Sequence, residues 1–459
     1  MLPAVAIIGR TNVGKSTLFN RITRSRRAIV ADEPGVTRDR LFGKTDYLGR
    51  PFIVIDTGGY EDPHGEFIKT QMLEQTELGI EEADVLVLVV DGLAGLLPAD
   101  QEVAARLRRS GKAVHLAVNK LDEQRFDAQR LPDFYALGFD TVHAISAEHG
   151  GGIDELLDAV TAGFPAAVEK PAEEQIDWEA EESEAEKQSK ADRPLRVALV
   201  GRPNVGKSSL VNKLLGYERM VVHDMPGTTR DAIDSELEWN GKRFILVDTA
   251  GVRRKSRVTD RIEKFSALKA FRAIAECDVA VLVLDATIGV HEQDARIAGM
   301  IVDEGRGIVV VFNKWDLPEG REQRIKELTE ELLDEMKFLP DPQIVFVSAK
   351  TGQRTPKILE LAEEAGRENS KRIPTSQFNE LLLQATERHK PPMWANHPIK
   401  FFYAAQIGVR PPTFALQTNW PQGVHFSYQR FLENTIRATY GFRGAPIRLK
   451  FRAKGGSRR

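Results

Sequence analysis

The stretch Gly9-Arg10-Thr11-Asn12-Val13-Gly14-Lys15-Ser16 occurs a second time as Gly201-Arg202-Pro203-Asn204-Val205-Gly206-Lys207-Ser208. Both copies fit the pattern G-x-x-x-x-G-K-[ST], and each follows a short apolar run that is typical of a buried strand. The glycines let the backbone approach phosphate oxygens, and the helix that starts inside the loop presents free N–H groups. We therefore predict two phosphate-binding loops, with Lys15 and Lys207 on the β- and γ-phosphates and Ser16 and Ser208 on Mg²⁺.

Bulk composition excludes several classes of protein. At 459 residues the chain is too long for one hydrophobic core, so several domains are expected. The single cysteine, Cys277, excludes an internal disulfide framework and a cysteine-based metal site, and it fits a reducing compartment. The first strand begins almost at Met1, and no apolar run approaches the roughly 18 residues of a membrane helix. We expect a cytoplasmic monomer that does not enter a membrane.

Charge is distributed unevenly along the chain. Residues 371–459 contain 15 lysines and arginines but only three acids, so this part carries a charge of +12 although the whole chain carries −3. Such asymmetry predicts an anionic partner for the basic part.

The first domain is predicted at residues 1–165, where short apolar strands alternate with helical segments. The expected strands are residues 5–8, 52–55, 85–90, 114–118 and 142–145. Continuous apolar runs are typical of a parallel sheet that is covered on both faces. The fold class is therefore α/β, with mostly parallel, doubly wound sheets.

The second domain, at residues 194–369, repeats the first. Its expected strands are residues 197–200, 244–247, 279–284, 308–312 and 344–347. Equivalent motifs are offset by 192 residues from Gly9 to Gly201, and by 202 from Ser146 to Ser348. An offset that grows only where surface segments can lengthen indicates an internal duplication.

Two further segments complete the chain. Residues 166–193 are rich in glutamate and are predicted to be a solvated linker; the alternative is an acidic decoy that competes with RNA for the basic end. Residues 370–459 are predicted to form a small α+β domain. Its expected elements are a helix at 378–386, strands at 399–406 and 413–417, a helix at 428–440 and a strand at 447–451.

The motif N-K-x-D follows an apolar strand in each half and predicts guanine recognition. The two copies are Asn119-Lys120-Leu121-Asp122 and Asn313-Lys314-Trp315-Asp316. A carboxylate at this place accepts hydrogen bonds from the N1–H and 2-amino groups of guanine, whereas adenine would leave it unsatisfied. Ser146-Ala147 and Ser348-Ala349 follow the next strand, where a backbone N–H can meet guanine O6.

A third pair of motifs predicts the metal site. Asp56-Thr57-Gly58-Gly59 and Asp248-Thr249-Ala250-Gly251 place an acid for Mg²⁺ and a glycine N–H for the γ-phosphate. Thr37 and Thr229, in matching loops, are candidates to complete the Mg²⁺ shell. Thr17 and Ser209, directly after the phosphate loops, complete the predicted nucleotide-binding set.

These motifs occur in GTPase order, twice, and are followed by a small basic domain. In this the chain resembles the bacterial double-GTPase family Der, also called EngA, over nearly its whole length. The resemblance implies a K-homology-like (KH-like) C-terminal domain and a role in assembly of the large ribosomal subunit. Thr11 departs from the proline that the family has and that stands at Pro203, which puts the local loop geometry in question.

Hydrolysis is less clearly specified than binding. Ras-like enzymes use a glutamine after D-x-x-G to orient water, and Tyr60 and Val252 stand there instead. The resemblance implies a K⁺-dependent family in which Asn12 and Asn204 help to hold K⁺ beside the phosphates. The alternative is that both asparagines only shape the loop. Lys15, Lys207, Thr37 and Thr229, with the two asparagines, are the candidate catalytic residues, and slow intrinsic hydrolysis is expected.

The basic domain interleaves arginine and lysine with aromatic residues, which favours contact with ribosomal RNA. Most of the aromatic residues are expected in its core. Gly441-Phe442-Arg443-Gly444 spells the G-x-x-G of K-homology domains, but it lies between a helix and the last strand, so we interpret it as a turn. Two other functions stay open: a nucleotide-gated scaffold with one nearly inactive half, and a GTPase that serves transfer-RNA modification.

Overall fold

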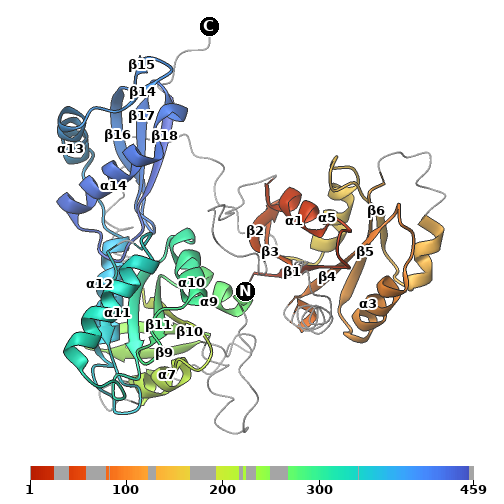
Figure 1. Ribbon diagram of the computed structural model, residues 1–459, viewed down its shortest axis with the longest axis horizontal. Coiled ribbons are helices and arrows are strands. Elements are labelled where there is room, and N and C mark those ends of the chain that lie inside the picture. Colours follow the sequence, from red (N-terminus) through yellow and green to blue (C-terminus); the bar gives the residue numbers. More distant parts are fainter. Residues whose placement is uncertain are drawn as a thin grey trace. The chain divides into compact units, whose positions relative to one another are not determined.

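The computed structural model describes residues 2–24, 41–57, 79–81, 83–121, 131–165, 193–216, 221–223, 234–248, 267–339 and 341–453 (Figure 1). The chain divides into two compact units, Met1–Glu173 and Glu174–Arg459. Several predicted residues lie outside the described ranges, namely Thr37, Gly58, Gly59, Tyr60, Asp122, Thr229, Thr249, Ala250, Gly251 and Val252, together with residues 166–192 of the acidic linker.

The first unit is built on a six-stranded sheet. In spatial order its strands are β2 (Leu41–Tyr47), β3 (Arg50–Asp56), β1 (Ala4–Ile8), β4 (Val85–Asp91), β5 (Ala113–Asn119) and β6 (Val142–Ala144). Strand β2 runs antiparallel to β3, and the remaining neighbours are parallel. Strands β1, β3 and β4 sit close to the predicted positions because their apolar runs are buried on both faces, whereas β6 is half-buried throughout.

Helices cover both faces of this sheet (Figure 1). Helix α1 (Lys15–Arg24) and helix α5 (Ile153–Thr161) share one hydrophobic cluster with β1, β3 and β4. Helix α3 (Pro98–Arg109) packs against β4 with Ala104 and Leu107 buried, and the short helix η1 (Tyr135–Leu137) lies beside it. The predicted doubly wound arrangement is confirmed.

The second unit repeats this plan in a seven-stranded sheet. In spatial order its strands are β13 (Gln343–Phe346), β12 (Gly307–Asn313), β11 (Val279–Asp285), β7 (Leu195–Val200), β10 (Lys242–Val247), β9 (Ser235–Trp239) and β8 (Val221–His223). Helices α7 (Lys207–Leu215) and α12 (Lys357–Asn369) pack on one face. Helices α9 (Ala267–Glu276), α10 (Glu292–Asp303) and α11 (Arg321–Glu335) pack on the other face.

The antiparallel strands at the end of each sheet were not predicted. Strand β2 contains Lys44, Thr45 and Asp46, and β9 reads Ser-Glu-Leu-Glu-Trp, so neither forms a continuous apolar run. In β9 buried and half-buried residues alternate, as in a strand with one face against the core. The antiparallel strands β2 and β9 therefore carry a weaker apolar signal than the central parallel strands do.

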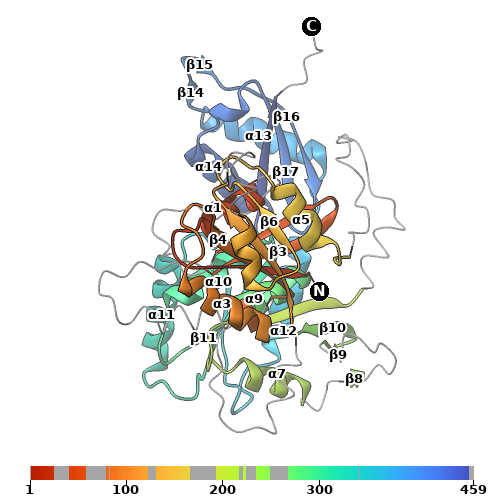
Figure 2. The same ribbon diagram turned by 90° about the vertical axis from the view of Figure 1, so that its right-hand side faces the viewer.

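Residues 370–453 form the predicted α-β-β-α-β order around a separate core. Helices α13 (Thr375–Arg388) and α14 (Phe426–Tyr440) pack on the sheet of β16 (Phe401–Gly408), β17 (Thr413–Thr418) and β18 (Arg448–Ala453) (Figure 2). A small hairpin of β14 (Met393–Trp394) and β15 (His397–Pro398) and the short helix η3 (Pro421–Gly423) are additions to the predicted order.

The predicted turn at residues 441–444 joins this small domain to the sheet of the second unit. The Ile308 N–H, near the start of β12, donates to the Gly444 carbonyl at 2.7 Å, and the Gly444 N–H donates to the Asp341 carbonyl at 3.1 Å. Gly444 has φ +65°, and a Cβ there would lie 2.6 Å from the Ile308 oxygen. Glycine is thus required both by the turn and by the close approach of the two backbones.

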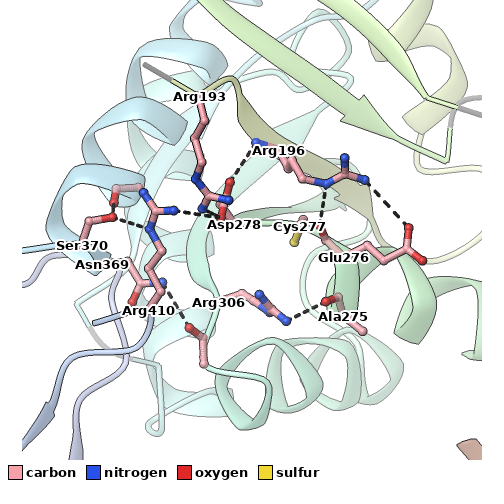
Figure 3. A network of polar contacts seen from close by, with 12 residues as sticks. Arg193, Arg196, Ala275, Glu276, Cys277, Asp278, Arg306, Asn369, Ser370 and Arg410 are labelled. Carbon is pink, nitrogen blue, oxygen red and sulfur yellow. Dashed lines mark hydrogen bonds and ion pairs between the residues drawn. The ribbon is translucent and has the colours of Figure 1, made fainter. Parts of the chain in front are cut away.

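A polar network reinforces the same junction (Figure 3). The Asp278 carboxylate pairs with Arg193 at 2.6 Å and with Arg410 of the small domain at 3.6 Å. The same carboxylate accepts the Arg196 N–H at 3.1 Å, while Arg410 also donates to the Ser370 hydroxyl at 2.7 Å. One acidic side chain therefore connects the start of the second unit with its C-terminal domain.

Candidate functional site

Both phosphate loops lie at the carboxyl end of a central strand. The first connects β1 to α1, and the second connects β7 to α7. Gly14 and Gly206 have φ +95° and +94°, and a Cβ on either would lie 2.2 Å from an asparagine amide nitrogen, that of Asn119 or Asn313. Asn12 and Asn204 both have φ 62°, so the loop with Thr11 keeps the backbone course of the loop with Pro203.

The loop lysines are held over the loop by backbone carbonyl groups. Lys15 Nζ donates to the Arg10 carbonyl at 2.7 Å, and Lys207 Nζ donates to those of Gly201 and Arg202 at 2.9 and 2.5 Å. Burial lowers the pKa of the Lys15 ammonium, while the nearby Asp56 carboxylate opposes that shift. Each ammonium group is therefore preorganised at the mouth of its loop, where phosphate oxygens would bind.

Asn119 and Asn313 bridge the phosphate loop and the base-binding loop. Asn119 Nδ2 donates to the Val13 carbonyl at 2.8 Å, and its Oδ1 accepts the Ala147 N–H at 2.9 Å. Asn313 repeats both contacts, to Val205 at 2.8 Å and from Ala349 at 3.0 Å. Since both amides are almost fully buried, the two nucleotide-binding loops of each domain are fixed to each other.

The lysine after each asparagine pairs with an aspartate that the sequence analysis did not single out. Lys120 Nζ lies 2.6 Å from Asp91 and donates to the Asn12 carbonyl at 3.0 Å, and Lys314 lies 2.6 Å from Asp285. Burial opposes ionisation of Asp91 and Asp285, but the hydrogen bonds from the lysine and from neighbouring residues together outweigh it and lower the pKa of both. In the sequence, the one feature that could have identified each aspartate as a site residue is its position at the end of an apolar strand.

The carboxylate that was predicted to bind guanine lies within the described residues in the second domain. The Ser348 hydroxyl donates to Asp316 Oδ1 at 2.6 Å, and this hydrogen bond lowers the pKa of the Asp316 carboxyl. Ser146 is buried like Ser348, and its oxygen accepts the His149 N–H at 3.2 Å. Asp316 is thus an ionised acceptor that the Ser348 hydroxyl orients. Asp122 lies outside the described residues.

The donor set beside each phosphate loop fits Mg²⁺, which prefers oxygen ligands and takes several of them from substrate phosphates. Ser16 and Ser208 begin the helices, and Asp56 ends β3 with 1% of its surface exposed. Asp248 follows β10, its N–H donates to Asp234 at 3.1 Å, and burial raises the pKa of its carboxyl. The Thr57 hydroxyl donates to the Ile7 carbonyl at 2.8 Å, which ties the ends of β3 and β1.

Comparison with known proteins agrees with this geometry. Residues 4–120 and 196–314 match the family described as 50S ribosome-binding GTPase, and residues 372–452 match the KH-domain-like C-terminal domain of EngA bacterial GTPase enzymes. A GTPase Der of Syntrophotalea carbinolica is 47% identical over 451 residues, which cover 98% of this chain and 99% of the relative. The GTPase Der of Geobacter metallireducens is 44% identical over 454 residues, with 99% of each chain covered. The chain belongs to the Der family of GTPases.

Among solved structures, the FeoB G-domain from Methanococcus jannaschii is similar to part of this Der chain. It is 29% identical, covers 35% of this chain and 97% of its own, and has a TM-score of 0.27. None of the described helices combines the length and apolar character that a membrane crossing requires. Within the described ranges, no three His, Cys, Asp or Glu side chains gather as a metal cluster.

The KH-like domain of this Der chain exposes basic groups on its last strand. Arg448, Lys450 and Arg452 are exposed along β18 and alternate with the half-buried Leu449 and Phe451. Most of its aromatic residues are buried or half-buried, as predicted, but Phe426 is 59% exposed and the Arg430 guanidinium lies 4.9 Å from its ring centre.

Arg437 has a structural role in this domain. Its two terminal nitrogens donate to the Phe442 and Ala445 carbonyls, each at 2.7 Å, and burial lowers its pKa. It therefore stabilises the turn at residues 441–444, although the arginines of this domain were expected to contact RNA.

Proposed function

We propose that this chain hydrolyses GTP slowly and takes part in assembly of the large ribosomal subunit, with its nucleotide state controlling domain arrangement and RNA association. The main support for this proposal is strand β12. It ends at Asn313 in the second nucleotide site, and near its start Ile308 is hydrogen bonded to Gly444 of the KH-like domain. A guanine site and a basic domain thus share one rigid element. We further propose a cytoplasmic monomer with domains at 1–165, 194–369 and 370–459 and a linker at 166–193.

Mg²⁺ would be held by Ser16, Asp56 and Thr37 in the first domain and by Ser208, Asp248 and Thr229 in the second. Bound there, it would neutralise charge on the phosphate oxygens. The chain's own contribution is positioning, because the loop lysine and the N–H groups at the helix start already point at the phosphate position. No glutamine follows either D-x-x-G, so slow intrinsic hydrolysis is proposed.

Hydrolysis is predicted to depend on K⁺. Asn12 and Asn204 are exposed at the loop tips in a left-handed conformation, so an amide oxygen is free to turn toward phosphate and cation. A cation there would stabilise the charge that an arginine finger stabilises elsewhere. Turnover measured in KCl is expected to exceed turnover in NaCl of equal ionic strength by about tenfold or more. Equal rates in the two salts would leave both asparagines with a loop-shaping role alone.

Ribosomal RNA binding is predicted to be salt-dependent and to use the exposed face of β18. Filter binding of the full chain to large-subunit RNA at rising KCl should show a steep loss of affinity, because each phosphate contact releases counterions. The variant Lys450→Ala/Arg452→Ala should weaken binding and lower the salt slope by about two. Lys326→Ala, an exposed lysine on α11, is the matched control.

Sedimentation with purified ribosomal subunits tests the partner itself. Association with the large subunit should differ between GDP and a non-hydrolysable GTP analogue, and it should be absent for the small subunit. Binding that is indifferent to nucleotide, or affinity that is insensitive to salt, would contradict the proposal.

A further inference from the structure

The arginine at the second position of each phosphate loop pairs with a buried aspartate. Arg10 Nε lies 3.3 Å from Asp100 Oδ1, and Arg202 Nε lies 2.9 Å from Asp294 Oδ2. The aspartate side chains are 1% and 0% exposed, against 20% and 13% for the arginines. The same pair, in the same place, occurs in both domains, so each half of the chain is an independent instance of it.

Each aspartate also anchors the start of a helix. Asp100 and Asp294 are the third residues of α3 and α10, and each accepts a backbone N–H from just before the helix, that of Leu97 or His291, at 3.1 Å. Burial raises the pKa of both carboxyl groups, and the helix N–H and the arginine oppose that rise. The carboxylate is therefore fixed on a rigid element and not on a loop.

The backbone of the arginine holds the loop lysine. The Arg10 carbonyl accepts Lys15 Nζ at 2.7 Å, and the Arg202 carbonyl accepts Lys207 Nζ at 2.5 Å. A continuous set of contacts thus runs from the helix, through the aspartate and the arginine side chain, to the ammonium group that faces the phosphates.

We propose that Asp100 and Asp294 are positioning residues for GTP hydrolysis, each fixing the phosphate-loop arginine whose carbonyl sets the place of the loop lysine. This inference rests on the proposed hydrolysis of GTP. It adds two aspartates outside the nucleotide-binding motifs, more than 80 residues from their loops in the sequence.

The expected effect lies in turnover more than in binding. In the ground state the loop N–H groups hold the phosphates, and those contacts do not need the arginine side chain. Negative charge builds up on the leaving β-phosphate oxygens only as the P–O bond breaks, so a displaced ammonium group stabilises the transition state less than a correctly placed one. A misplacement of about 1 Å outside the reacting centre can cost a hundredfold in rate.

The test uses the full chain with Lys207→Ala, so that the measured GTP hydrolysis comes from the first domain. Arg10→Met and Asp100→Asn are each expected to lower kcat for GTP by roughly tenfold to a hundredfold, with Kd for GDP changed less than about threefold. Asparagine keeps an acceptor for the Leu97 N–H, so the helix start survives. Arg10→Lys should restore at least a third of kcat, because the contact is made by Nε, which a lysine chain reaches.

Glu102→Ala is the matched control, since it breaks only the exposed pair with Arg106 on the same helix. Asp294→Asn in a Lys15→Ala background repeats the test, with Glu292→Ala as its control. Values of kcat within twofold of the control would overturn the inference. So would a common fall of kcat, GDP affinity and melting temperature, which indicates packing alone. A parent chain that binds GDP but turns over no GTP would contradict the proposed function, and the positioning role with it.

Discussion

Lys207→Ala is expected to lower hydrolysis by the second domain about 10²–10³-fold, and Lys15→Ala to do the same for the first. Each ammonium group is held at its loop by carbonyl oxygens, 2.7 Å from Arg10 in the first domain and 2.9 Å from Gly201 in the second. Alanine removes the positive charge that is proposed to face the β- and γ-phosphates and leaves nothing to replace it. The loss should therefore appear in the rate constant of GTP hydrolysis measured under single-turnover conditions.

Comparison of the two single variants with the double variant assigns turnover to each domain. The double variant should hydrolyse no more than about 1% of the wild-type rate, and Lys326→Ala on the surface of α11 should match wild type. Substantial hydrolysis by the double variant would contradict the assignment of either lysine. A single variant that keeps normal turnover but loses ribosome association would favour the nucleotide-gated scaffold over the hydrolytic switch.

Asp316→Asn is expected to change the base that the second domain binds. The Asp316 carboxylate is held by the Ser348 hydroxyl at 2.6 Å, which lowers its pKa and keeps it an acceptor for the N1–H and 2-amino groups of guanine. An amide offers one acceptor and one donor, and its donor opposes the guanine 2-amino group. We expect GTP affinity to fall about a hundredfold or more, because two charge-assisted hydrogen bonds are lost or reversed.

Xanthosine triphosphate provides the decisive comparison. Xanthine carries a carbonyl in place of the 2-amino group, so the asparagine donor can pair with it while N1–H still meets the amide oxygen. In a Lys15→Ala background, the Asp316→Asn variant should prefer xanthosine triphosphate to GTP in competition binding, and the parent should show the reverse preference. A variant that keeps the parent's preference would show that Asp316 does not read the base.

Much of the fold and site follows from local sequence patterns. Each phosphate loop and each N-K-x-D directly follows a continuous apolar strand, and parallel strands place such loops at one edge of the sheet. The structure brings Asn119 and Asn313, which begin those motifs, within hydrogen-bond distance of the Val13 and Val205 carbonyls, each at 2.8 Å.

The antiparallel strands β2 and β9 and the docking of the small domain could not be predicted from apolar runs. Strand β2 is interrupted by charged residues, and β9 alternates, so neither produces the apolar run by which the central strands were found. The turn at residues 441–444 was predicted, but its place against β12 was not, because the contact of Gly444 with Ile308 uses backbone groups only.

The sequence by itself determined the nucleotide, the duplication and the basic domain, because each depends on residue types at short fixed spacing or on composition. Tertiary structure alone decided which charges meet. Asp91 lies 2.6 Å from Lys120, Asp100 lies 3.3 Å from Arg10, and Asp278 lies 3.6 Å from Arg410. Each of these pairs joins residues that are far apart in the chain. The sequence does not distinguish an aspartate that is buried beside a cation from one that is exposed to solvent. Burial, which makes such a pair costly to break, is a property of the folded chain.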